Sequence, residues 1–170
     1  MSHSSRRPGW RDVRGQAVAE FALVLPLILF LFLGMIELGN ALAVSHSLSK
    51  LSREGANIAS RGTSLDTVLN VVARTGDDIR LSERGGSVVS RVEIRADGPR
   101  VLEQVATPGF ARLSEMGEVG ERPVLLASID LQPGNTHYVV EVFYYYEPVT
   151  PFARLFKTAL QEPIYDRAVF

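Results

Sequence analysis

The stretch that decides the fold runs from Phe21 to Ile36, reads FALVLPLILFLFLGMI and contains no charged residue. Glu20 and Glu37 bracket it, and Leu38–Ser45 continues it with apolar and small residues. A helix rises about 1.5 Å per residue and the hydrocarbon core is about 30 Å thick, so about 20 residues are needed to span it. The uncharged run alone is slightly short. We therefore expect a transmembrane helix over residues 16–45.

Charge is distributed unevenly along the 170 residues, although the formal net charge is only −1. Residues 1–15 carry four arginines and one aspartate, so a basic head precedes the apolar block. The positive-inside rule keeps such a head in the cytoplasm and places the body of the chain on the other side of the membrane. The near-neutral total argues against a nucleic-acid partner. Cysteine is absent, which excludes disulfides, thiolate metal sites and cysteine nucleophiles.

Several interpretations of the apolar block are open. A cleaved secretory signal would end in a small-x-small site, which Ala41-Leu42-Ala43 fits loosely. A plain signal anchor would retain the whole block. A buried helix of a soluble domain would need apolar partners on every face, which a domain of this size rarely provides. In a class III signal the basic leader is removed and the helix is kept, and the residues around Gly15 favour this interpretation.

The junction between head and block reads Arg14-Gly15-Gln16-Ala17-Val18-Ala19-Glu20-Phe21. It resembles the type IV prepilin processing site, in which a membrane aspartyl peptidase cuts after the glycine. Cleavage would create an α-amino group on Gln16, a cation near neutral pH that could pair with Glu20 of the same or a neighbouring subunit. Such a pair would offset the cost of a carboxylate at the mouth of a membrane helix and set the register of packed helices. Alternatively, Glu20 merely sits among lipid headgroups.

Pro26 lies inside the apolar run. Proline removes one helical hydrogen bond, so we expect a kink or local unwinding of the membrane helix at this position. Membrane helices tolerate such a residue when neighbouring groups satisfy the freed carbonyl. Flexibility used during assembly and a harmless kink are both consistent with the pattern.

From Gly15 to Ala56 the chain resembles the TadE-like family of tight-adherence pseudopilins, which are related to type IV pilins. The matching stretches are Gly15–Pro26, Gly34–Ala41 and Arg53–Ala56, with weaker matches at Glu141–Pro148 and Tyr165–Ala168. The resemblance implies a minor pilin or pseudopilin of a bacterial inner membrane, with its C-terminal domain in the periplasm. It also implies cleavage between Gly15 and Gln16 by a prepilin peptidase, and a role for Glu20 and Phe21 in helix register and assembly.

The partners implied by this resemblance are the prepilin peptidase, other pilins or pseudopilins that pack against the N-terminal helix, inner-membrane pilus assembly proteins and the lipid bilayer. The rival interpretation is an uncleaved single-pass membrane scaffold protein of a secretion machine. Many members of the family carry periplasmic cysteines, and because this chain has none, any disulfide role in the family does not transfer to it.

The fold class expected is α+β, with a long N-terminal membrane-spanning helix followed by a small pilin-like domain built on an antiparallel sheet. The division expected is a leader over 1–15, the membrane helix over 16–45 and the outer domain over 46–170. Within that domain the patterns predict that the first helix continues to Ser60, and that a second helix, capped by Ser64, runs from Leu65 to about Arg80.

Strand patterns are predicted for Val88–Arg95, Val124–Leu131 and Tyr138–Tyr146, the last two joined as a hairpin through Pro133-Gly134-Asn135. Residues 101–120 are expected to be mostly loop, and the tail with Pro148, Pro151 and Pro163 extended or irregular. Tyr144-Tyr145-Tyr146 is interpreted either as alternating core and edge aromatics or as a contact surface for a partner.

Chemistry-bearing residues form no recognisable catalytic pattern. His3, His46 and His137 have no metal-ligand spacing, so no metal and no cofactor are expected. Asp77-Asp78 with Glu83 fits a solvated helix end better than an acid pair. Nucleophile-elbow and phosphate-loop motifs are missing from the sequence, so catalytic residues are not expected and the chain is not expected to be an enzyme.

Overall fold

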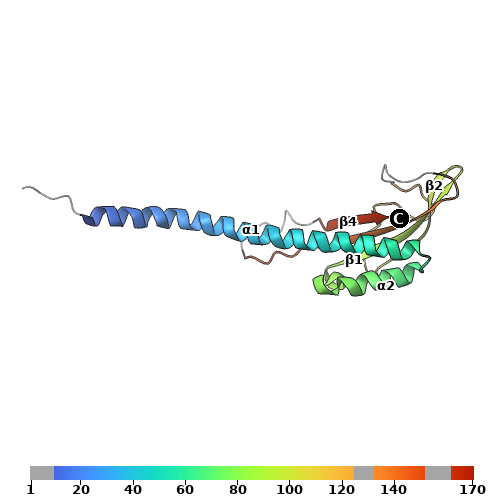
Figure 1. Cartoon of the computed structure of the whole chain (residues 1–170), viewed down its shortest axis with the longest axis horizontal. Helices are drawn as coiled ribbons and strands as arrows, with labels where there is room; N and C mark the ends of the chain where they lie inside the picture. The colour runs from blue at the N-terminus through green and yellow to red at the C-terminus, as the bar shows by residue number, and fades with distance from the viewer. Residues whose placement is uncertain (1–9, 125–131, 152–161) are drawn as a thin grey trace, which may run out of the picture.

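The computed structural model describes residues 10–124, 132–151 and 162–170. One long helix is exposed and apolar in its N-terminal part and packs into a small α+β domain in its C-terminal part (Figure 1). The helices are α1 (Trp10–Ser60), α2 (Leu65–Thr75), the 3₁₀ turn η1 (Gly76–Ile79) and the single-turn α3 (Leu81–Arg84). The strands are β1 (Gly85–Arg95), β2 (Gly98–Ala106), β3 (Thr136–Tyr144) and β4 (Ile164–Val169). The predicted α+β class, with a long N-terminal helix and an antiparallel sheet, is confirmed.

The sheet has the order β2-β1-β3-β4, and every neighbouring pair is antiparallel. Because side chains alternate across a strand, each strand presents one set of residues to α1 and α2 and another to the opposite face. Val89, Val140 and Val142 pack in the core shared with the helices. Val92, Val139 and Met116 form a second cluster on the other face, which the segment after β2 covers.

Helix α1 changes character along its length. Its side chains from Gly15 to Phe32 are all exposed, whereas its last turns bury one face. The buried positions recur every three or four residues, as expected for one helix face against a sheet: Leu48, Leu51, Ser52, Gly55, Ala56 and Ala59. The N-terminal part of this helix therefore remains exposed, whereas its C-terminal part packs against the sheet of the outer domain (Figure 1).

The second helix begins where the sequence predicts. The Ser64 side chain accepts a hydrogen bond from the Thr67 amide at 3.4 Å, which is the N-cap interaction. Its end was predicted at about Arg80, but α2 stops at Thr75 and η1 follows. The helix ends at its C-cap, Gly76, because glycine disfavours a helix interior, and the missing side chain leaves room for Leu81, which would lie 2.9 Å from an added Cβ.

Three other expectations are corrected. Residues 101–106 belong to β2 rather than to a loop, because Val101 is buried against β1. Residues 164–169 of the tail form β4. Both edges of β3 are occupied by β1 and β4 over Val139–Tyr144, so this stretch has no edge left for the predicted hairpin partner. Most of that partner, residues 125–131, lies outside the described residues, and Val124 is not in a strand.

Gly55 marks the closest approach of α1 to the domain. A Cβ built there would lie 2.7 Å from Cγ2 of Val72 and 3.2 Å from Cγ1 of Val140. Gly55→Ala should therefore destabilise the outer domain by about 1–3 kcal/mol, the usual cost of overpacking. The measurement is the urea midpoint of the full chain in detergent, followed by pulse proteolysis. Gly39→Ala is the matched control on the same helix, because nothing lies within 4 Å of its Cβ; an equal loss in both variants would contradict the packing argument.

Candidate functional site: the membrane helix and its carboxylate clamp

The predicted processing and assembly residues lie together on the exposed part of α1. Gly15, Gln16, Glu20, Phe21 and Pro26 are all exposed, and the helix continues through them without interruption. The Gln16 side-chain amide donates to Glu20 Oε1 at 2.9 Å, one helical turn away. Glu20 thus has a local partner in the uncleaved chain. Cleavage after Gly15, the assembly role and the kink at Pro26 stay predictions.

The exposed part of α1 has the properties of a membrane span. It holds the one helix in the described chain that is long and apolar enough to cross a bilayer, and its most apolar window is fully uncovered by protein. Large apolar side chains point outward all round it, including Leu23 at 80% and Leu31 at 62% exposure. A helix that is apolar on every face and lacks protein partners is suited to lipid or to neighbouring helices.

Beyond the span, the carboxylate of Glu37 is held by a segment that is distant in sequence. We call this segment, Tyr145–Pro151, the strap; it continues β3 past the end of the sheet and runs along α1 (Figure 1). The Tyr146 hydroxyl donates to Glu37 Oε1 at 2.7 Å and the Val149 amide donates to the same oxygen at 3.1 Å. The amide and hydroxyl of Thr150 donate to Oε2 at 2.9 and 2.8 Å. We call these four contacts the Glu37 clamp.

The Glu37 clamp joins the membrane helix to the outer domain by charge-assisted hydrogen bonds, which are stronger than neutral ones. Thr150 and the nearby Pro148 are buried, so the strap is packed against the rest of the protein. Burial and the hydrogen bond to Glu37 raise the pKa of the Tyr146 phenol above its ordinary value, which keeps this group a donor. Arg84 also pairs with Glu147 of the strap at 2.8 Å.

A second polar contact ties β4 to the same helix. The Ser49 hydroxyl donates to Asp166 Oδ1 at 2.9 Å, and the Ser52 hydroxyl donates to Asp166 Oδ2. Ser49 and Ser52 are one turn apart, so both hydroxyls reach one carboxylate from a single helix face. The two contacts pin the C-terminal strand of the sheet to α1.

On the opposite face of the sheet, Glu141 of β3 is completely buried. Its carboxylate accepts from the Ser114 hydroxyl, from the Glu115 amide at 2.9 Å and from the Tyr165 hydroxyl at 2.9 Å. Burial raises the pKa of Glu141 despite these donors and the nearby Arg167. The group fastens the segment after β2 onto the sheet.

These contacts account for residues that the sequence patterns left without a role. Tyr144, Tyr145 and Tyr146 are buried, exposed and half-buried respectively, so the triplet alternates between core and surface, and Tyr146 binds Glu37. In the sequence pattern Glu37 marks only one boundary of the apolar run. Its partners lie more than 100 residues away, and the one available signal was that both segments occur among the stretches of family resemblance.

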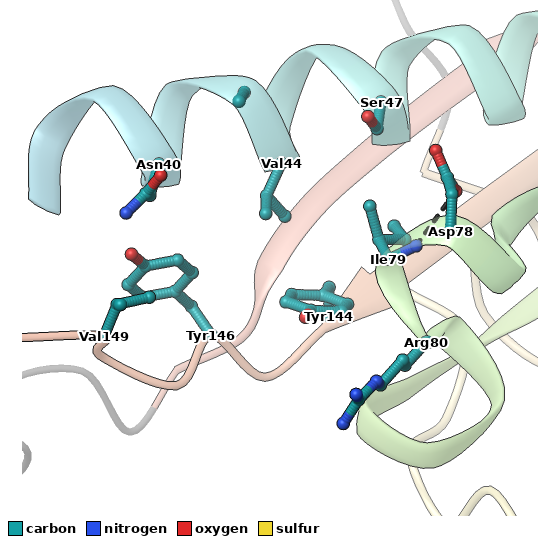
Figure 2. A pocket seen from close by; sticks show the side chains of 10 residues that line it. Asn40, Val44, Ser47, Asp78, Ile79, Arg80, Tyr144, Tyr146 and Val149 are labelled. Atoms are coloured by element: carbon teal, nitrogen blue, oxygen red, sulfur yellow. Dashed lines mark hydrogen bonds between the residues drawn. The ribbon is translucent and has the colours of Figure 1, made fainter. Parts of the chain in front are cut away.

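The groove beside the strap is open and has a volume of about 310 Å³. Figure 2 shows Asn40, Val44 and Ser47 of α1 on one side and Tyr144, Tyr146 and Ile79 on the other, with Asp78 and Arg80 at the rim. Asp77, Asp78 and Glu83 are exposed. Within the described ranges, no group of three or more histidines and carboxylates lies close enough together to hold a metal ion.

Over the described residues, a single exposed apolar helix that continues into a small α+β domain is compatible with a single-pass membrane protein. Residues 15–57 match the family model described as TadE-like protein. The match begins at the predicted processing glycine and includes Glu37 and Gly55, and it supports a pseudopilin associated with tight-adherence pili in general. The chain matches no curated protein and no solved structure.

Removing the Glu37 carboxylate should release the strap. In Glu37→Ala the amides of Val149 and Thr150 lose their acceptor, and a hydrogen bond to a charged group is worth about 1.5–3 kcal/mol. We expect hydrogen exchange of these two amides to accelerate by about tenfold or more, since 1.36 kcal/mol corresponds to tenfold. Glu20→Ala is the matched control, because Glu20 bonds to Gln16 and not to the strap; unchanged exchange in Glu37→Ala would refute the clamp.

Proposed function

We propose that this chain is a minor pilin or pseudopilin of a tight-adherence pilus secretion system, without catalytic activity of its own. A prepilin peptidase removes residues 1–15, and the mature chain takes part in pilus assembly or priming. The observation that carries the proposal is the TadE-like match over residues 15–57, a segment that is one exposed apolar helix over most of its length.

The mechanism proposed is lateral packing of α1 against the helices of other pilins. Before cleavage Glu20 is bonded to Gln16. After cleavage the new α-amino group on Gln16 provides a cation that can pair with Glu20 in the same or a neighbouring subunit. The exposed Phe21 lies beside it and adds apolar contact area. Inner-membrane pilus assembly proteins and the bilayer are the remaining partners, and the outer domain faces the periplasm.

The test is the intact mass and N-terminal sequence of the protein purified from membranes, with and without the prepilin peptidase. We expect a start at Gln16 only when the peptidase is present, and no cleavage in Gly15→Ala. Nothing lies within 4 Å of a Cβ at Gly15, so alanine fits there and a loss of cleavage would report on the peptidase and not on misfolding. Gly9→Ala, another glycine of the leader, is the matched control and should be cleaved normally.

Two results would refute the processing step. An intact start at Met1 or Ser2 under both conditions would leave the uncleaved membrane scaffold as the function. A start near Val44 would indicate an ordinary secreted domain, in which the membrane helix, and with it the packing mechanism, is lost.

A further inference from the structure

The outer domain contacts α1 only from a definite position onward. From Gly15 to Ile36 every side chain except Leu33 is exposed, whereas from Glu37 one helix face is covered at every turn. The covered residues between the span and the core are Glu37, Asn40, Ala41, Val44, Ser45 and Ser47. The outer domain therefore reaches down the helix as far as Glu37, well inside the 16–45 segment that the sequence predicts to be transmembrane.

The groups beside residues 40–47 are too polar for hydrocarbon. Asp78 and Arg80 are exposed charges at the rim of the groove, at its Ser47 end, while Asn40 faces Tyr146 of the strap (Figure 2). Bilayer that extended to Ser45 would enclose the strap and reach the charged rim of the groove. Charged side chains and irregular backbone are both costly where they are exposed to the hydrocarbon region.

The length of the uncovered helix agrees with a hydrocarbon boundary that lies before Ser45 in the chain. From Gln16 to Ile36 the helix rises about 31 Å, against a hydrocarbon core of about 30 Å. Continuing from Glu37 to Ser45 would add about 14 Å. The uncovered part alone is sufficient to span the bilayer.

We propose that the outer hydrocarbon boundary lies at Glu37 and that the strap rests on the phospholipid headgroups at that level. The exposed side chains of Tyr145 (43%) and Val149 (63%) are the lipid contacts, since tyrosines favour the membrane interface. The Glu37 clamp sets how deeply α1 is inserted. Deeper insertion of α1 would carry the strap, and then the charges at the groove rim, into the hydrocarbon region. This inference rests on the membrane insertion included in the proposed function, but not on leader cleavage.

Cysteine labelling can locate the boundary, because the natural chain has no cysteine. Single variants Leu31→Cys, Leu42→Cys and Ser60→Cys replace side chains that are all exposed, so the protein itself hides none of them. Open inner-membrane fragments containing the full chain are treated with a water-soluble maleimide that reaches both sides. We expect Leu42→Cys to be labelled as completely as Ser60→Cys, while Leu31→Cys stays unlabelled.

Two labelling results would overturn the inference in distinguishable ways. Protection of Leu42→Cys at the level of Leu31→Cys would extend the bilayer past Glu37 and leave membrane insertion intact. Labelling of Leu31→Cys would show that α1 does not span the membrane, and the membrane part of the proposed function would fail as well.

Lipid contact of the strap is measured separately, with the full chain in vesicles of phosphatidylcholine and phosphatidylglycerol. Val149→Trp is made with Trp10→Phe, which removes the single natural tryptophan. Bromine atoms near the headgroup end of the acyl chains should quench this tryptophan more strongly than bromine atoms near the chain ends. Val119→Trp, similarly exposed but on the segment that bonds to β2, is the control and should not be quenched. An unquenched Val149→Trp, or stronger quenching by deep bromine, would refute the contact.

Discussion

Gly85→Ala should destabilise the outer domain by about 3 kcal/mol or more, at the upper end of the range for overpacking. A Cβ at Gly85 would lie 2.0 Å from the carbonyl oxygen of Phe143 and 3.1 Å from Cα of Tyr144. Both atoms belong to the backbone of β3, so no side-chain rotation relieves the clash. The measurement is the urea midpoint of the full chain in detergent by pulse proteolysis.

The clash at Gly85 lies at the start of the contacts between β1 and β3 and of the strap. Gly85 pairs with Tyr144 at the first position of the β1–β3 ladder, and the Arg84 carbonyl accepts from the Tyr145 amide at 2.7 Å. Separating the strands there would also displace the start of the strap, so Gly85→Ala should speed exchange of the Val149 and Thr150 amides. Gly39→Ala adds the same methyl group in open space and serves as control. A midpoint for Gly85→Ala equal to that of the control would contradict the packing of β1 on β3.

Glu141→Ala is expected to have the second large effect. It leaves the Ser114 hydroxyl, the Glu115 amide and the Tyr165 hydroxyl without their acceptor on a buried face. An unsatisfied buried donor costs about 1–3 kcal/mol, so a loss of about 3 kcal/mol is expected for the group. The measurement is again the urea midpoint, and a loss below about 1 kcal/mol would mean that these donors find water or other partners.

Glu141→Gln is the conservative control and tests the charge. Burial raises the pKa of Glu141 in the folded chain, so protons bind more tightly to the folded than to the unfolded state. The stability contributed by protonated Glu141 is therefore complete below the ordinary pKa of 4.5 and is lost as pH rises through the raised value. The free energy of unfolding of the natural chain, relative to Glu141→Gln, should fall over this interval. A difference that does not vary with pH would contradict the raised pKa.

The four predictions on stability and exchange divide the molecule into separable parts. Gly55 and Gly85 concern the packing of α1 and β1 on β3, Glu141 the opposite face of the sheet, and Glu37 the strap alone. Glu37→Ala should accelerate amide exchange in the strap while leaving the core clusters intact, because the carboxylate lies outside both. This separation allows the membrane-facing contact to be altered in a chain whose outer domain remains folded.

Much of the fold could be predicted where the determining interactions are local. The apolar run, the Ser64 cap and the alternating pattern of Val88–Arg95 depend on neighbours a few residues away. The predicted strand Tyr138–Tyr146 corresponds to β3, displaced by two residues at each end. Strand β4 was missed because Ile164–Val169 is short, follows a proline and mixes charged with apolar residues.

The sequence by itself determined that a basic head is followed by a helix able to cross a membrane, then by a domain with helical and strand segments, because periodicity and charge are properties of adjacent residues. Only the tertiary structure decided which strands flank β3, that Asp166 meets Ser49 and Ser52, and that the strap encloses Glu37. The contacts of Asp166 and of Glu37 join residues separated by more than 100 positions, and the geometry of all three arrangements depends on the packing of the whole domain. In the sequence, Glu37 marks only the end of an apolar run, whereas in the folded chain its carboxylate is bound by the strap.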